Sequence, residues 1–332
     1  MTQSDPLRYV LITPARNESK YIENTIHTVA RQTHLPVRWV IVNDGLTDNT
    51  GIIVARYAAQ YDWIQVVNRP RRQTRDFAAK VHAFRAGQEQ LAGIDYDIIG
   101  NLDGDVTLDP DHFAFLMSRF AEDPDLGVAG TTFREEDGYN SATDSFEGQN
   151  YVSGQCQIFR RECFEMIGGY LPSKAGGIDW IAVTTARMLG WKTRSFREKP
   201  FFHHRPLGTA THGPVRKSFD YGRKDYYLGG HPIWQTIRSA YQIFKRPYII
   251  GGLGIFAGFF TGYFSGKPRV VSPELMRFHR REQMVKLRAI LRSLIQLKKI
   301  DNFGLLPVMQ ANRQQRSPHN SSPAATSPGT IS

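Results

Sequence analysis

Short apolar runs alternate with amphipathic segments along the first half of the chain. Between the first two runs, Ile22, Ile26 and Val29 recur at the spacing of one face of a helix. This strand–helix–strand rhythm predicts an α/β fold with a mostly parallel central sheet. The runs with the length of buried strands are residues 9–12, 39–42, 63–67 and 97–102.

Polar clusters follow the first, second and fourth of these runs. Asp44 comes soon after the second run, and Asp103 directly follows the fourth. The carboxyl ends of parallel strands meet at one edge of a sheet, and ligands bind there in such folds. The sequence therefore predicts that Asp44 and Asp103 lie at one crevice.

The segment Asp103-Gly104-Asp105 predicts a metal site. Two carboxylates two residues apart in an extended segment point to the same side, and Gly104 allows a tight turn between them. Hard divalent cations such as Mg²⁺ or Mn²⁺ prefer oxygen ligands and accept bridging phosphate oxygens. A solvated turn also explains the motif in isolation, but its place at a strand end favours a metal that holds a diphosphate.

Asp44 lies in the segment Asn43-Asp44-Gly45 and has two interpretations. Its carboxylate could accept hydrogen bonds from a nucleotide base or from ribose hydroxyls. Asp-Gly is also a common turn dipeptide, so a plain turn explains the pattern equally well.

Asp179 follows Gly176 and Gly177 and precedes a helical segment at residues 181–189. In this position it could be the N-cap of that helix. It could instead be a general base at the start of the helix, next to a flexible glycine loop. The sequence leaves both interpretations open.

Basic residues and histidines provide candidates for contacts with a metal or a phosphate. His204, in the segment 203–205, could complete the metal shell or contact a diphosphate, although a structural histidine explains it as well. Lys80 could neutralise phosphate. The same holds for Arg75, Arg216, Lys217 and Arg223.

The pattern changes after residue 235. Residues 248–264 form an almost uncharged apolar run with five glycines, and residues 284–297 predict a basic amphipathic helix. We expect the region 236–312 to be helical and to hold the protein on a membrane through an interfacial or re-entrant hairpin. A soluble helical subdomain is the alternative. The tail, residues 313–332, is predicted to be disordered.

Charge is unevenly distributed along the chain. Residues 1–150 carry a net charge of −8 and residues 151–332 a net charge of +19. We therefore expect the second half to bind an anionic partner. Its helices with aliphatic faces favour a membrane surface over nucleic acid as that partner. Two cysteines, Cys156 and Cys163, and an N-terminus without a secretory signal predict a cytoplasmic protein at the cytoplasmic face of a membrane.

Five segments, taken together and in order, resemble the family 2 glycosyltransferases, which have the GT-A fold. The resemblance covers roughly residues 8–235, so we expect residues 1–235 to form one GT-A domain. The segments that carry it are Ile12–Glu18, Val42–Thr50, Leu102–Asp105, Gly154–Tyr170 and Gly177–Trp191.

The resemblance implies an inverting, metal-dependent transferase that moves a sugar from a nucleotide-diphosphate sugar to a hydroxyl of a glycan or lipid-linked acceptor. By position, Asp179 would be the base and Asp44 would bind the nucleoside. Asp103 and Asp105 would bind the donor ribose and the metal. The loop after the first strand would lie at the nucleotide through Pro14, Arg16 and Glu18.

Three departures from the family pattern leave the nucleotide base open. Asn43, Leu46 and Ile178 replace residues that the family usually has as Asp, Ser and an acidic residue. The Q-x-x-R-W signature of processive polysaccharide synthases is missing after Asp179. The sequence therefore favours addition of one sugar or a few over processive polymerisation.

Two other classes of protein fit parts of the pattern. A nucleotidyltransferase on a related fold would need a glycine-rich loop after the first strand, and residues 14–18 lack glycine. A catalytically silent glycan-binding or membrane-binding protein would not need Asp103, Asp105 and Asp179. Both alternatives are therefore less consistent with the sequence than a transferase.

Overall fold

Strands and helices alternate in the first half of the protein, as the apolar pattern predicts. The four predicted strands are β1 (Tyr9–Ala15), β2 (Arg38–Asp44), β3 (Ile64–Arg69) and β4 (Ile98–Leu102). The later strands are β5 (Val106–Thr107), β6 (Leu126–Glu135), β7 (Cys156–Arg160) and β8 (Lys192–His203). The computed structural model describes residues 6–45, 47–70, 77–145, 148–173, 175–205, 213–245 and 247–296.

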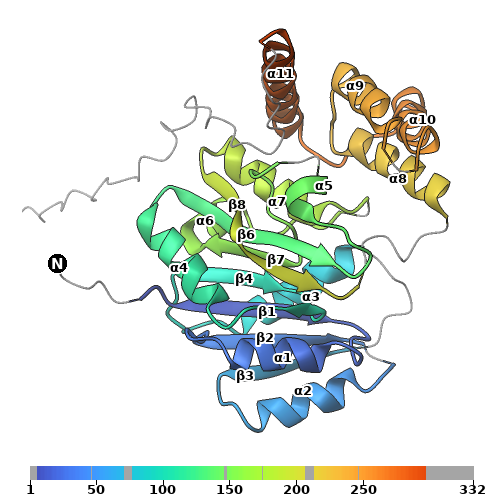
Figure 1. Cartoon of the computed structure of the whole chain (residues 1–332). Coiled ribbons are helices and arrows are strands. Elements are labelled where there is room, and N and C mark those ends of the chain that lie inside the picture. Colours follow the sequence, from blue (N-terminus) through green and yellow to red (C-terminus); the bar gives the residue numbers. More distant parts are fainter. Residues whose placement is uncertain are drawn as a thin grey trace, which may run out of the picture.

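Within these described residues, the strands form one mixed sheet of eight strands (Figure 1). The strand order is β3-β2-β1-β4-β7-β6-β8-β5. Strands β1 to β4 are parallel, and β7 pairs antiparallel with both β4 and β6. β8 runs parallel to β6 and antiparallel to the short β5. The predicted α/β fold with a mostly parallel sheet is confirmed.

Helices cover both faces of the sheet, because successive side chains of a strand point to opposite faces. Tyr9, Leu11 and Trp39 belong to the apolar core on one face, with α1, α2 and α4. Val10 and Val40 belong to the core on the other face, with α3, α6 and α7. These helices are α1 (Ile22–Ala30), α2 (Thr50–Ala58), α3 (Phe77–Glu89), α4 (His112–Glu122), α6 (Arg161–Met166) and α7 (Ile178–Met188).

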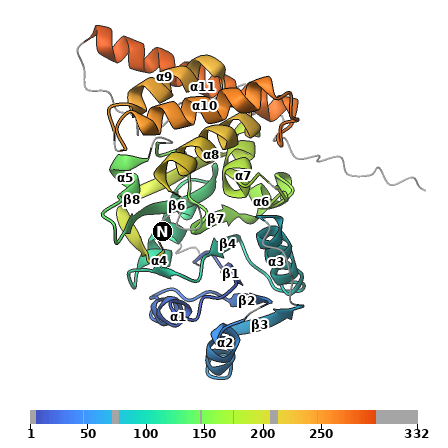
Figure 2. The same cartoon turned by 90° about the vertical axis from the view of Figure 1, so that its right-hand side faces the viewer.

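Four longer helices follow the sheet and lie together beyond α7 and the short α5 (Ser141–Asp144) in both views (Figures 1 and 2). Glycines allow α8 and α10 to pack with their backbones in contact. An added Cβ would lie 1.9 Å from the Ile255 carbonyl oxygen at Gly222 and 2.0 Å from the Phe219 carbonyl oxygen at Gly258. The four helices that follow the sheet are α8 (Pro214–Tyr227), α9 (Pro232–Gln242), α10 (Ile250–Phe264) and α11 (Pro273–Ile295).

The predicted apolar run at residues 248–264 is largely α10, and this helix lies against α8 instead of standing alone. Among the described helices, none is both long enough and apolar enough to cross a membrane. The expected domain boundary at residue 235 falls within α9, and the division into domains stays a prediction. The predicted disordered tail, residues 313–332, lies outside the described residues.

Candidate active site

Asp44 is the last residue of β2, at the carboxyl end of the parallel strands. Its Oδ1 accepts a hydrogen bond of 2.8 Å from Nη1 of Arg69. Arg69 is the last residue of β3 and lies opposite Asp44 in the strand register. The ion pair holds a buried carboxylate at the sheet edge, where the sequence predicts a nucleoside contact.

Asp103 follows β4 at the same edge of the sheet. Its Oδ1 accepts hydrogen bonds from Nζ of Lys80 at 2.6 Å and from Nδ2 of Asn101 at 3.1 Å. Burial acts to lower the pKa of Lys80, but the charges of Asp103, Asp179 and Asp105 raise it. The lysine from α3 is therefore positively charged and interacts with all three candidate carboxylates.

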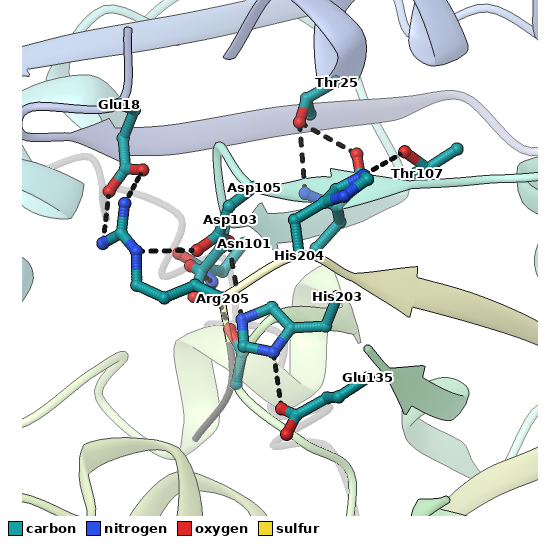
Figure 3. A network of polar contacts seen from close by, with 12 residues as sticks. Glu18, Thr25, Asn101, Asp103, Asp105, Thr107, Glu135, His203, His204 and Arg205 are labelled. Carbon is teal, nitrogen blue, oxygen red and sulfur yellow. Dashed lines mark hydrogen bonds and ion pairs between the residues drawn. The ribbon is translucent and has the colours of Figure 1, made fainter. Parts of the chain in front are cut away.

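Asp105 is buried between the side chains of His203 and Arg205 (Figure 3). Its Oδ1 lies 3.6 Å from Nε2 of His203, and its Oδ2 lies 3.7 Å from Nε of Arg205. Burial acts to raise the pKa of Asp105, but His203 and then Arg205 and Lys80 lower it. At Asp103, burial and repulsion from Asp105 raise the carboxyl pKa despite the attraction of Lys80. The two carboxyl groups of the motif therefore have different proton affinities.

Glu18 connects the loop after β1 to this cluster. Nη1 of Arg205 donates to Oε1 of Glu18 at 3.1 Å, and Nη2 of Arg205 donates to Oε2 (Figure 3). Burial and repulsion from Asp105 raise the pKa of Glu18 to about 7, although Arg205 acts in the opposite direction. Pro14 lies in β1 and Arg16 directly follows it, both half-buried, so the whole predicted loop lies at this sheet edge.

The carboxylates at this edge fit a divalent cation. Asp103 and Asp105 offer oxygen ligands, and Oδ1 of Asp105 is buried without a hydrogen-bond partner among the described residues. An unsatisfied buried oxygen costs free energy, which a cation would offset. No group of three or more His, Cys, Asp or Glu side chains in the described ranges could hold a metal by itself. A cation would therefore need further oxygen ligands, and a diphosphate can supply them.

His203, not His204, lies beside Asp105. Nδ1 of His203 is 2.7 Å from Oε1 of Glu135, and the charges of Asp105 and Glu135 raise the pKa of His203 although burial lowers it. Nε2 of His204 instead lies 2.6 Å from Oγ1 of Thr107. Adjacent residues at the end of a strand point in opposite directions, so only one of the two histidines can face Asp105. The side chain of His203 therefore contacts Asp105, whereas a role of His204 in the metal shell stays a prediction.

Asp179 lies in the first turn of α7 and is not its N-cap. The N-cap is Gly177, whose φ of 75° is in the left-handed region, and no side chain caps this helix. Oδ2 of Asp179 instead accepts a hydrogen bond from the hydroxyl of Tyr151. Gly154 provides the necessary space, because an added Cβ there would lie 3.0 Å from Cβ of Asp179. The structure excludes the cap interpretation, and the role of a base stays a prediction.

A cavity of about 600 Å³ adjoins Asp179. Its wall includes residues of β6, β8 and the segment before β7 on one side, and residues of α8, α9 and α11 on the other. Tyr151, Gln155 and Asp179 all line it. The amide nitrogen of Asp103 donates to the carbonyl oxygen of Gln155 at 2.8 Å. A residue in the cavity wall is thus hydrogen-bonded to the backbone of Asp103, directly after β4.

Sequence reasoning missed Tyr151 and Glu135. Each contacts its partner across a long stretch of chain, and the local sequence around neither residue carries a motif. His203 lies in a segment that the sequence did single out. The strand register needed to choose between it and His204 is decided by β8 pairing with β5 and β6.

A family model described as "Glycosyl transferase family 2" matches residues 10–168. Over these residues, which are just under half of the chain, the protein is similar to glycosyltransferase family 2. Family 2 enzymes are nucleotide-sugar glycosyltransferases. The matched residues include Asp44, Asp103 and Asp105 but end before Asp179.

Two curated relatives are named poly-beta-1,6-N-acetyl-D-glucosamine synthase. The protein of Staphylococcus aureus (strain COL) is 31% identical over 112 residues, which are 34% of this chain and 25% of the relative. The protein of Staphylococcus epidermidis is 28% identical over 253 residues, which are 67% of this chain and 56% of the relative. The chain thus spans about half or less of the length of these relatives.

Two solved structures share the fold of family 2 with this chain. A Pyrobaculum calidifontis mannosyltransferase, PcManGT, in complex with GDP-Man and Mn²⁺ is 17% identical, with a TM-score of 0.51 over 90% of this chain and 82% of that one. S. aureus TarS 1-349 in complex with UDP-GlcNAc is 15% identical, with a TM-score of 0.52 over 90% of this chain and 89% of that one. At such identities the likeness shows the GT-A fold.

Proposed function

We propose that this protein transfers a sugar from a nucleotide-diphosphate sugar to a hydroxyl group of an acceptor, with inversion at the anomeric carbon. The observation that carries the proposal is the position of Asp179, in the wall of a cavity that also contains Gln155, the hydrogen-bond partner of the Asp103 backbone. The names of the relatives and the donors held by the two solved structures support a nucleotide-sugar donor and a role in glycan or polysaccharide assembly.

The donor would bind across the carboxyl ends of β1, β2 and β4. Asp44 would accept hydrogen bonds from the nucleoside. Asp103 and Asp105 would hold Mg²⁺ or Mn²⁺, which supplies positive charge for the leaving diphosphate, and Lys80 adds a second charge beside Asp103. His203, which contacts Asp105, would be a candidate metal-shell residue beside His204. The loop proposed to line the nucleotide contains Pro14, Arg16 and Glu18.

Asp179 would act on the acceptor. The hydroxyl of Tyr151 donates to one of its oxygens, which fixes the orientation of the carboxylate and leaves the second oxygen to take a proton. Removal of the proton makes the acceptor oxygen a better nucleophile. Attack on the anomeric carbon from the face opposite the leaving diphosphate gives an inverted product.

The test is the near-isosteric change Asp179→Asn, which keeps a hydrogen-bonding group but cannot accept the proton. Transfer should fall by about two to four orders of magnitude, the usual worth of a general base. Calorimetric affinity for UDP-GlcNAc or GDP-Man with Mn²⁺ should stay within a few-fold of wild type. The matched control is Asp95→Asn, which alters an exposed carboxylate paired with Arg8, and it should transfer at the wild-type rate. Full transfer activity in Asp179→Asn would overturn the assignment.

We also propose that the protein attaches to an anionic membrane surface through α9, α10 and the segment between them. Apolar side chains are exposed there: Phe244 is 79% exposed, Leu253 56% and Phe264 80%. Lys245 and Lys267 flank this surface, and each basic group near an anionic membrane contributes about 1 kcal/mol. Gly254, Gly258 and Gly262 of α10 face α8 and Gly252 faces the end of α9, so the exposed apolar side chains of α10 lie away from both helices and can contact lipid.

Vesicle co-sedimentation tests the membrane proposal. The full chain should sediment with phosphatidylglycerol vesicles, and Phe264→Ser combined with Phe244→Ser should weaken binding by about tenfold or more, because two large apolar side chains lose their contact with lipid. Ile52→Ser is the matched control, since Ile52 is 73% exposed on α2. Equal binding of all three proteins, or binding by none, would contradict the proposal.

A further inference from the structure

The C-terminal helices present basic side chains to the cavity beside Asp179. On α8, Lys217 and Lys224 are seven residues apart and so lie on one face of the helix. Arg238 of α9 and Lys286 of α11 line the cavity from two further directions. Lys245, just after α9, and Arg197 of β8 complete the set of lining Lys and Arg side chains.

The cavity wall is positively charged overall. Among the described residues, six Lys or Arg side chains line it against three carboxylates, Asp144, Asp179 and Asp225, which gives these residues a net charge of +3. Asp225 forms an ion pair with Arg238. His279 adds no charge near neutral pH, because burial lowers its pKa to about 3. Charges of one sign that line a cavity raise the local concentration of ligands of the opposite sign.

Lys224 places one of these charges next to the proposed base. An added Cβ on Gly177 would lie 3.2 Å from Cε of Lys224. Gly177 is the N-cap of α7, two residues before Asp179. The free amide groups of a helix N-terminus also favour negative charge. An anionic group bound by Lys224 would therefore lie at the N-terminal turn of α7, which carries the residue that we propose to deprotonate the acceptor.

The diphosphate of the donor does not account for these charges. The cations that adjoin Asp103 and Asp105 are Lys80, His203 and Arg205. Among the described residues, none of these three lines the cavity, and neither Asp103 nor Asp105 does. The basic side chains of the cavity are thus separate from the side chains that adjoin Asp103 and Asp105, where the donor diphosphate would bind.

The remainder of the wall fits a carbohydrate. Hydroxyl and amide side chains line the side formed by β6 and the segment before β7, among them Ser141, Ser153 and Gln149. Aromatic rings of Trp180, Tyr221 and Trp234 also line the cavity and offer flat surfaces for sugar rings. Polar groups and aromatic faces together with a positive net charge are suited to a charged sugar.

We propose that the acceptor is anionic and carries a phosphate or carboxylate group close to its reacting hydroxyl. Lys217, Lys224 and Lys245 bind this group, while Asp179 contacts the hydroxyl. Hydrogen bonds between ammonium groups and phosphate or carboxylate are among the strong ones in proteins. The inference rests on the proposed glycosyltransferase function and adds the chemical class of the acceptor.

The acceptor can be free or attached to a lipid. The cavity wall reaches Lys245 and Pro247. Their neighbours Phe244 and Tyr248 are exposed apolar residues of the proposed membrane surface. The cavity and that surface are therefore adjacent, so a lipid-linked acceptor could place its charged headgroup in the cavity without leaving the membrane.

Fluorescence of the full chain tests the inference, because Trp180 and Trp234 line the cavity. The probes are three oligosaccharides of equal length that end in a neutral sugar, a uronic acid or a sugar phosphate. At least one anionic probe should bind about tenfold or more tightly than the neutral one, and its binding should weaken as salt increases. Equal binding of all three probes would overturn the inference.

Single-residue variants test whether the lysines of the cavity cause the preference for anionic probes. Lys224→Gln and Lys245→Gln should each weaken binding of the anionic probe about tenfold and leave the neutral probe unchanged. Arg277→Gln removes one positive charge from an exposed site on α11 outside the cavity and should change neither. Circular dichroism confirms that each variant is folded. If both lysine variants bind the anionic probe as wild type does, the lysines do not form the site.

Two further measurements separate the possible failures. If neither UDP-GlcNAc nor GDP-Man binds with Mn²⁺ in calorimetry, the proposed function fails at its donor, whereas donor binding without selectivity for anionic probes refutes only the acceptor class. Sugar phosphate attached to a lipid in neutral vesicles is then compared with the free sugar phosphate. Tighter binding of the lipid form identifies a lipid-linked acceptor, and equal binding identifies a free one; both results support an anionic acceptor.

Discussion

A buried ion pair between Arg187 on α7 and Glu282 on α11 joins the helix that carries Asp179 to the C-terminal helices. Nε of Arg187 donates to Oε1 of Glu282 at 2.7 Å, and Nη2 donates to Oε2 at 3.0 Å. The two side chains are only 15% and 7% exposed. Arg187→Met would leave the carboxylate of Glu282 buried without a cation, which costs about 3–5 kcal/mol.

Arg187 also donates hydrogen bonds to Asn150, Thr184 and Thr193, which raise this figure. Its Nη1 donates to the backbone oxygen of Asn150 at 2.9 Å, and losing a hydrogen bond of this kind costs about 1 kcal/mol. Glu282→Leu should cost a similar 3–5 kcal/mol, because it leaves Arg187 unpaired. The double variant carries neither charge, so it should lose only about 1–2 kcal/mol of the free energy of unfolding.

Urea unfolding followed by circular dichroism measures all four proteins and completes a double-mutant cycle. The matched control is the exposed pair Arg161 and Glu165, whose side chains are 44% and 58% exposed. Arg161→Met should cost less than about 1 kcal/mol. If the double variant at Arg187 and Glu282 loses the sum of the two single losses, the pair is not coupled and the reasoning fails.

Three further predictions concern the metal, the helix packing and pH. Asp105→Ala should abolish Mn²⁺-dependent binding of UDP-GlcNAc or GDP-Man in calorimetry while the melting temperature stays close to wild type; unchanged affinity would refute a metal role. Gly258→Ala should cost about 1–3 kcal/mol in thermal unfolding, because its Cβ would lie 2.0 Å from the carbonyl oxygen of Phe219, whereas the exposed change Thr261→Ala should cost little. Burial lowers the pKa of His112 to about 4, below its ordinary 6.5, because the folded protein favours the neutral imidazole. The stability that this preference contributes is present above pH 6.5 and is lost as pH falls towards 4. The free energy of unfolding should therefore fall by about 2 kcal/mol between pH 7 and pH 5. In His112→Gln, urea unfolding at a series of pH values should show a pH dependence that lacks this part.

The polar clusters at the sheet edge show how much of the candidate site can be predicted from the sequence. The apolar runs predict β1 to β4, and parallel pairing then brings the strand ends together, so Asp44 and Asp103 could be assigned to one edge from their positions alone. The same reasoning could not show that Lys80 pairs with Asp103, because that contact depends on how α3 packs on the sheet.

Local patterns also left alternatives that only three-dimensional contacts resolve. The sequence pattern places Asp179 just before a helix, as an N-cap would be, but in the structure Gly177 is the N-cap and Asp179 lies in the first turn, where its carboxylate accepts a hydrogen bond from Tyr151. His203 and His204 are equivalent in the sequence, and the register of β8 decides that His203 faces Asp105.

The sequence by itself determined the alternation of strands and helices, the carboxylates at the strand ends and the resemblance to family 2. These features depend on periodicity and on short motifs, which are properties of neighbouring residues. Only the tertiary structure decided the contact of Arg205 with Glu18, the packing of α8 on α10 and the basic cavity beside Asp179. These features join residues that are far apart along the chain. Their geometry is set by how helices and strands pack, and no local pattern encodes that geometry.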